Sequence, residues 1–137
     1  MTRQLERGTS LTEALAATVL GIVAALAMVY ALSSGNASIQ AMRIERAAIT
    51  TAQQKMEKLL AKPTGDAQLS VGNHGPESVT LPYKTGQTSW VVAWQDDPID
   101  GSGVGDTDPQ DYKKLTVTVS WTDAIARSTS MSTFLYP

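Results

Sequence analysis

The stretch Arg7-Gly8-Thr9-Ser10-Leu11-Thr12-Glu13 decides the fold of this chain, because it leads straight into an apolar segment over residues 14–32. Residues 1–8 form a short basic leader that ends in glycine. Glu13 is the only charged residue between Arg7 and Arg43. A carboxylate at the mouth of a membrane-length helix is costly, so it usually has a partner or a role.

The apolar segment is long enough to cross a membrane. The run over residues 15–32 is interrupted only by Thr18 and Gly21, and about 18–20 apolar residues span a bilayer core. Arg3 and Arg7 precede the run, and the next basic residue is Arg43. This asymmetry predicts a single-pass helix over residues 9–32, with its amino terminus in the cytoplasm and the rest of the chain outside.

This order of residues resembles the class III signal of type IV pilins and type II secretion pseudopilins. The resemblance implies that a prepilin peptidase cuts between Gly8 and Thr9, that the new amino terminus is methylated, and that Glu13 becomes the fifth mature residue. Leu11 fits the apolar third position of the family, whereas Thr9 and Thr12 stand where the family more often has apolar residues. The implied location is the bacterial inner membrane, with the head periplasmic or extracellular, and then a pilus or pseudopilus.

The charge of Glu13 has a physical interpretation of its own. Cleavage after Gly8 would leave an ammonium group about one helical turn from the Glu13 carboxylate. The two charges can neutralise each other within one subunit or between staggered neighbours, away from water. Two alternatives remain open: Glu13 is a lone interfacial residue beside a signal anchor, or a conventional signal is cleaved near Gly35.

The second half of the stem, residues 33–62, is predicted to be an amphipathic helix. Residues 33–36 are poor helix formers, so we expect the helix to loosen or kink there. Beyond them the apolar residues recur at spacings of three and four, and Pro63 ends the pattern. The apolar positions are Ile39, Met42, Ile44, Ala48, Ile49, Ala52, Met56, Leu59 and Leu60. Residues 52–60 resemble the end of the stem in minor pilins of the modification-protein type and in minor pseudopilin I.

The remainder, residues 63–137, is predicted to be a β-sheet head. Strands are expected at 68–71, 77–81, 89–95, 114–121 and 128–136, separated by turn residues. The clearest strand places Leu115, Val117, Val119 and Trp121 on one face by strict alternation. The tryptophans are interpreted as core residues rather than as a ligand box. The fold class is therefore α+β: a long amino-terminal helix, half transmembrane and half amphipathic, packed on a small antiparallel sheet.

Composition narrows the functional classes. A chain of 137 residues provides one small domain and an extended helix, and without cysteine it has no disulfide. The net charge of −2 and the few basic residues of the head, Lys84, Lys113, Lys114 and Arg127, argue against a nucleic-acid partner. No nucleophile elbow, phosphate loop or paired acid–base motif is present, so the sequence gives no ground for an enzyme.

One loop is rich in aspartate. Residues 95–111 hold six aspartates and several glycines, and calcium prefers six to eight oxygen ligands. Asp100, Asp106 and Asp108 are the predicted ligands if calcium binds. The spacing does not match an EF-hand loop, and a solvated turn is the alternative. The single histidine, His74, lies among turn residues and is predicted to be a loop residue.

The sequence thus favours a structural minor pilin or pseudopilin. The expected partners are prepilin peptidase, other pilin or pseudopilin subunits, an inner-membrane assembly platform and membrane lipid. Two other hypotheses stay open: a signal-anchored or secreted binding module whose sheet is a ligand surface, and a competence pilus subunit that handles DNA.

Overall fold

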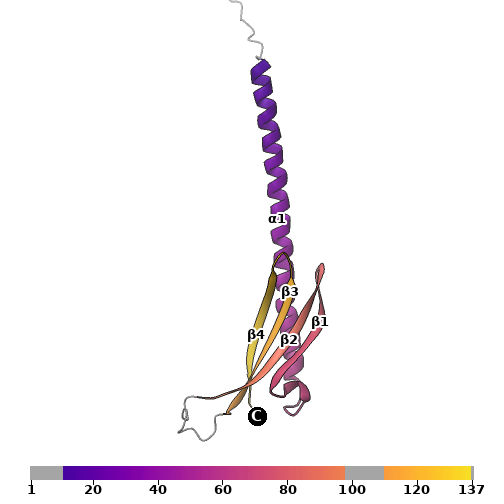
Figure 1. Ribbon diagram of the computed structural model, residues 1–137, viewed down its shortest axis with the longest axis vertical. Coiled ribbons are helices and arrows are strands. Elements are labelled where there is room, and N and C mark those ends of the chain that lie inside the picture. Colours follow the sequence, from indigo (N-terminus) through magenta and orange to yellow (C-terminus); the bar gives the residue numbers. More distant parts are fainter. Residues whose placement is uncertain (1–10, 98–109, 137) are drawn as a thin grey trace, which may run out of the picture. The chain divides into compact units, whose positions relative to one another are not determined.

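The computed structural model describes residues 11–97 and 110–136, and these residues form one long helix and a four-stranded antiparallel sheet. Helix α1 runs over Leu11–Leu60, and a short 3-10 helix, η1, follows over Ala67–Leu69. The strands are β1 (Gly72–Leu81), β2 (Lys84–Gln95), β3 (Tyr112–Thr122) and β4 (Ala126–Leu135). The predicted α+β arrangement is confirmed (Figure 1).

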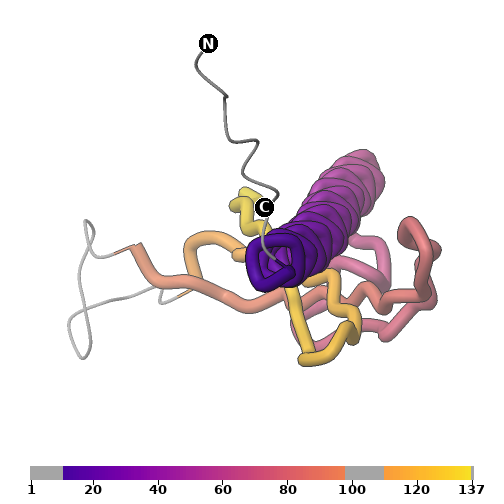
Figure 2. Tube along the Cα trace, turned by 90° about the horizontal axis from the view of Figure 1, so that it is seen from above, coloured from indigo at the N-terminus to yellow at the C-terminus, as the bar shows by residue number. Residues whose placement is uncertain are grey.

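The sheet is a simple meander. Its strand order is β1-β2-β3-β4, so each strand pairs with its neighbours in the sequence. Figure 2 traces the same elements from above, from the indigo start of α1 to the yellow strand β4. By contacts the chain divides into two units, Met1–Ala41 and Met42–Pro137. The carboxy-terminal part of α1 therefore belongs to the same compact unit as the sheet.

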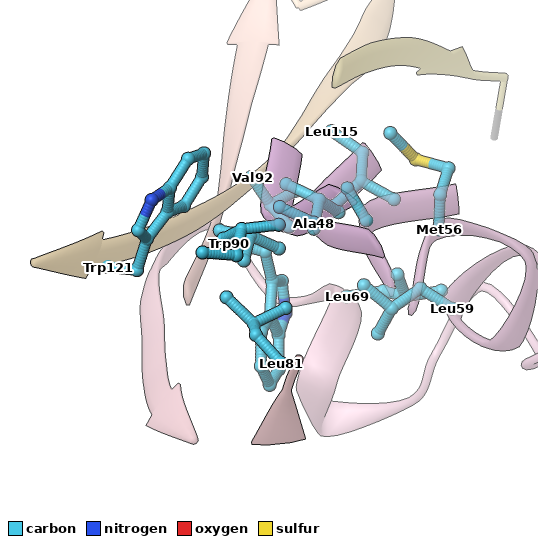
Figure 3. Close-up of a cluster of buried hydrophobic side chains, with 13 residues drawn as sticks. Ala48, Met56, Leu59, Leu69, Leu81, Trp90, Val92, Leu115 and Trp121 are labelled. Atoms are coloured by element: carbon cyan, nitrogen blue, oxygen red, sulfur yellow. The ribbon is translucent and has the colours of Figure 1, made fainter. Parts of the chain in front are cut away.

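The core lies between this part of α1 and one face of the sheet. The helix contributes Ile44, Ala48, Ala52, Met56 and Leu59, which recur every three or four residues and so share one face. The sheet and η1 contribute Leu69, Leu81, Trp90, Val92, Leu115, Val117, Val119 and Trp121. Figure 3 shows side chains from all of these elements gathered in the core.

The alternation predicted for residues 115–121 is confirmed. Leu115, Val117, Val119 and Trp121 are buried, whereas the residues between them are only half-buried. Trp90 and Trp121 are core residues, as expected, whereas Trp94 is half-buried and lies outside the core. The apolar stripe of the helix is narrower than predicted, because Ile39, Met42, Ile49 and Leu60 are exposed. An amphipathic pattern alone does not say how wide a strip the sheet covers.

Residues 33–36 do not loosen the helix as expected. Helical structure continues through them and ends at Leu60, two residues before the predicted end. Low helix propensity costs only fractions of a kcal/mol per residue for serine and asparagine and about 1 kcal/mol for glycine. These costs are small enough for the neighbouring turns to keep the four residues helical. After Leu60 the chain turns, and Lys62 still donates a backbone hydrogen bond to Leu59 at 3.1 Å.

The start of the sheet also differs from the prediction. The expected strand at 68–71 is wrong: η1 occupies Ala67–Leu69 and is capped by Asp66, whose carboxylate accepts from the backbone N–H of Gln68 at 2.8 Å. Strand β1 instead begins at Gly72 and includes His74, which is therefore not a loop residue. A register shift between His74 and Glu77, with Gly75 at φ 88°, places turn-type residues within a strand.

Candidate functional site

The amino-terminal part of α1 carries the one predicted functional residue that the structure describes. Glu13 lies in the first turn of α1, where a carboxylate is favoured by the helix dipole. No Asp, Glu, Lys or Arg follows it until Arg43. The predicted processing residues Gly8 and Thr9 lie outside the described residues.

This part of the helix exposes its apolar side chains. Every residue from 11 to 40 is exposed. The large apolar residues concerned are Leu11, Leu15, Val19, Leu20, Ile22, Val23, Leu26, Met28, Val29, Tyr30 and Leu32. Soluble monomers rarely expose such a continuous apolar surface, so it indicates a membrane or another protein surface.

Length and hydropathy agree with a membrane span. An 18-residue window of α1 has a mean hydropathy of 2.4, and none of it is buried. Such a window is about 27 Å long at 1.5 Å per residue, close to the thickness of a bilayer core. Within residues 11–97 and 110–136, α1 is the one helix long and apolar enough to cross a membrane.

Thr18 and Gly21 in this segment are both compatible with a helix that packs in lipid. The hydroxyl of Thr18 donates to the carbonyl of Ala14 at 2.8 Å, so its polar hydrogen is satisfied within the helix. A Cβ added to Gly21 would meet no atom within 4 Å. Packing within the chain therefore does not require glycine here, whereas a second helix could approach closely at this position.

The predicted calcium ligands Asp100, Asp106 and Asp108 lie outside the described residues. At the two ends of that segment, the backbone N–H of Asp97 donates to the carboxylate of Asp111. In the part of the chain that the structure describes, no group of three His, Cys, Asp or Glu side chains is placed to hold a metal ion. The calcium hypothesis thus remains a prediction from sequence.

A polar and aromatic cluster on the head was not predicted. Lys55 Nζ lies 2.7 and 2.9 Å from the two carboxylate oxygens of Glu77 and 3.9 Å from the centroid of the Trp90 ring. His74 stacks on Trp90 with ring centroids 5.4 Å apart, and its Nε2 lies 2.8 Å from the carbonyl oxygen of Ser70. These contacts fasten β1 to α1 and β2. The sequence alone does not show these contacts, because they depend on the packing of α1 and on the register that pairs His74 with Trp90, just before the shift in β1.

A small apolar cavity lies where β4 ends. It has a volume of about 230 Å³ and is lined by Thr64, Gly65, Leu69, Trp94, Lys113, Leu135 and Tyr136. Lys113 Nζ stands 4.9 Å from the centroid of the Trp94 ring. The sequence offered no signal for this cavity, since its lining comes from four separate segments.

Comparison with known proteins adds no family to these observations. No protein-family model, curated protein or solved structure matches the chain.

Proposed function

We propose that this chain is a structural minor pilin or pseudopilin subunit. In this proposal a prepilin peptidase removes residues 1–8, and the apolar part of α1 holds the subunit in the inner membrane with its amino terminus in the cytoplasm. The helices of neighbouring subunits then assemble side by side into a type IV pilus or a type II secretion pseudopilus. The β-sheet head carries the contacts that distinguish this subunit.

One observation carries the proposal: Glu13 opens an exposed apolar helix that continues into the core of a four-stranded head. A plain membrane anchor needs no carboxylate at its start, because the charge makes insertion less favourable. In a bundle of such helices the carboxylate can form an ion pair with the amino terminus of a neighbour that lies beside it. The charge then selects the stagger between subunits rather than merely opposing insertion.

Mapping the mature amino terminus tests the processing step. The full chain is co-expressed with a prepilin peptidase and its mass is measured. We expect a chain that starts at Thr9, with one added methyl group. Two glycine variants provide a matched pair: Gly8→Leu is expected to abolish cleavage, and Gly35→Leu to leave it unchanged. A chain that starts near Gly35 or Asn36 would instead identify an ordinary secretory signal and contradict the proposal.

Substitution of Glu13 tests the assembly step. Glu13→Gln keeps the size of the side chain and removes its charge. We expect normal cleavage at Thr9 but at least tenfold less subunit in sheared filaments or in complexes with other pilin subunits. Glu45→Gln, an exposed glutamate on the same helix, is the control and should assemble normally. If Glu13→Gln also behaves like the wild type, the alternative of a signal-anchored binding module is favoured.

A further inference from the structure

The two edges of the sheet are built differently. Edge strand β1 is interrupted by the register shift between His74 and Glu77 and contains Pro76, which has no backbone N–H. Its Glu77 is also held by Lys55. Bulges, prolines and charges are the devices that stop a further strand from adding to an edge. The β1 edge is therefore protected.

Edge strand β4 has neither a bulge nor a proline, and its one charged residue, Arg127, lies near its start. It pairs with β3 without a register shift, from Thr122 opposite Ala126 to Lys113 opposite Leu135. Residues 128–135, Ser-Thr-Ser-Met-Ser-Thr-Phe-Leu, include no charge, proline or glycine. A long regular edge of this kind presents a row of backbone donors and acceptors to any extended chain that approaches.

Side chains of β4 extend the hydrophobic core to this edge of the sheet. Met131 and Leu135 of β4 pack against the core while remaining partly accessible. On the opposite face the strand presents serine hydroxyls, and that of Ser132 lies 2.9 Å from the hydroxyl of Thr116 on β3. A strand added beside β4 would thus extend an apolar inner face and an uncharged, hydroxyl-rich outer face.

The apolar cavity described above lies at the end of the same strand, since Leu135 and Tyr136 line it. Its volume of about 230 Å³ is below the roughly 300–1,000 Å³ of pockets that hold whole small molecules. It is better matched to one large side chain. Trp94 and Leu69 provide apolar walls for such a side chain.

We propose that the β4 edge and this cavity together form a β-augmentation site for an extended segment of a different protein. The segment runs antiparallel to β4, as every pair in this sheet does. It carries small uncharged side chains on the outer face, apolar side chains on the inner face, and one bulky apolar residue that enters the cavity. Backbone hydrogen bonds along β4 provide affinity, and the cavity provides selectivity.

A different protein fits this edge better than a second copy. Antiparallel pairing of β4 with the β4 of a copy would run the two helical segments from Met42 to Leu60 in opposite directions. Copies anchored in one membrane emerge from it in the same direction, and this step alone rests on the proposed function. Pairing of β4 with the β1 of a copy meets the bulge and Pro76.

Peptide binding to the purified full chain in detergent micelles tests the site. The probe is a fluorescent peptide with the sequence of residues 115–121, because this part of β3 already pairs with β4 and has apolar side chains on one face and small uncharged ones on the other. We expect saturable binding by fluorescence anisotropy. Thr133→Lys, on the inner face of the edge, and Ser132→Lys, on its exposed outer face, should each weaken binding at least tenfold. Ser78→Lys on β1 is the matched control and should change it less than twofold.

The cavity is tested with the same probe. Leu135→Ala should weaken binding three- to tenfold while the edge remains regular. Absence of saturable binding would overturn the site, as would equal loss in the Ser78→Lys control. Dimers of the wild type that Ser132→Lys abolishes, seen by sedimentation, would identify a second copy as the occupant and overturn the choice of partner. None of these measurements needs cleavage or filament assembly. The binding site can therefore be refuted while the proposed function stands, and the reverse is also true.

Discussion

Thr88 carries a buried hydroxyl that lacks a hydrogen-bond partner within the described part of the chain. The residue is 1% exposed and lies opposite Val119, which is fully buried. An unsatisfied buried polar group costs about 1–3 kcal/mol. Thr88→Val replaces the hydroxyl with a methyl group of similar size, so we expect the free energy of unfolding to rise by about 1 kcal/mol. Urea denaturation followed by tryptophan fluorescence measures this change.

The opposite exchange provides the control for Thr88. Val119→Thr places a new hydroxyl in the same layer of the core, and we expect it to lower the free energy of unfolding by about 1–3 kcal/mol. A loss of stability in Thr88→Val would contradict the prediction. That result would show that a bound water satisfies the Thr88 hydroxyl.

Asp66 links stability to pH at the turn after α1. Its carboxylate accepts from the backbone N–H of Gln68 at 2.8 Å and from Lys62 at 3.0 Å, and these bonds hold the pKa of Asp66 below its ordinary value. As the pH falls, the unfolded carboxyl binds a proton first, at a pKa of about 3.9. The stabilisation is therefore complete above that pH and is lost as the pH falls through the lower folded pKa.

Asp66→Asn should remove this pH dependence. We expect the difference in unfolding midpoint between wild type and variant to shrink as the pH falls from 5 to 2.5, since the variant keeps an uncharged cap acceptor. Thermal unfolding at fixed ionic strength measures the difference. Lys62→Met should retain most of the effect, because the bond from Gln68 is the larger cause. A difference that does not change with pH would contradict the assignment.

Among the elements, the regular strands and the second half of β1, residues 77–81, could be predicted from sequence, whereas the start of β1 could not. The alternation over residues 115–121 fixes which side chains face the core, because one register alone buries four apolar residues. Strand β1 has no such alternation. Its glycine and proline are typical of turns, and only pairing with β2 makes this stretch a strand. The strand predicted at residues 68–71 was wrong for a local reason, since the Asp66 cap favours a short helical turn there.

The irregularity in β1 leads to a prediction about Gly75. Its φ is 88°, in the left-handed region, and an added Cβ would lie 2.9 Å from the carbonyl oxygen of Thr88 and 3.2 Å from the Cα of Ser89. Both contacts are with backbone, which cannot move aside easily. We therefore expect Gly75→Ala to lower the free energy of unfolding by about 1–3 kcal/mol. Urea denaturation is the measurement.

Gly65→Ala is the matched control for this position. Gly65 has no positive φ, and a Cβ there would meet no atom within 4 Å. We expect its effect on the free energy of unfolding to stay within about 0.5 kcal/mol or to be slightly stabilising. Equal losses in the two variants would mean that the bulge at β1 does not need glycine.

At the scale of the whole molecule, sequence and structure inform different parts of the function. The leader, Glu13 and the apolar run are contiguous in the sequence, so the hypothesis of a processed membrane helix needs no three-dimensional information. The β4 edge and the cavity at its end depend on strand order and on residues from separate segments. Residues 128–135 carry no proline or charge that would mark β4 as an edge strand, and so this surface could not be predicted.

The division of the chain at residue 41 leads to the last prediction. Every buried core residue lies within Met42–Pro137, and the first of them is Ile44. The exposed apolar surface of residues 11–32 lies outside that unit. A chain that begins at Met42 should therefore fold in water without detergent, with an unfolding midpoint close to that of the full chain in micelles. Circular dichroism measures both the fold and the midpoint.

A shorter chain that begins at Gln53 is the control. It loses Ile44, Ala48 and Ala52 from the core, and burial of the Ile44 side chain alone contributes about 1.5–3 kcal/mol. We expect it to unfold at a clearly lower temperature or to aggregate through the uncovered face of the sheet. If the chain from Met42 also needs detergent, then the amino-terminal helix stabilises the head, and the membrane segment is not merely an anchor and assembly surface.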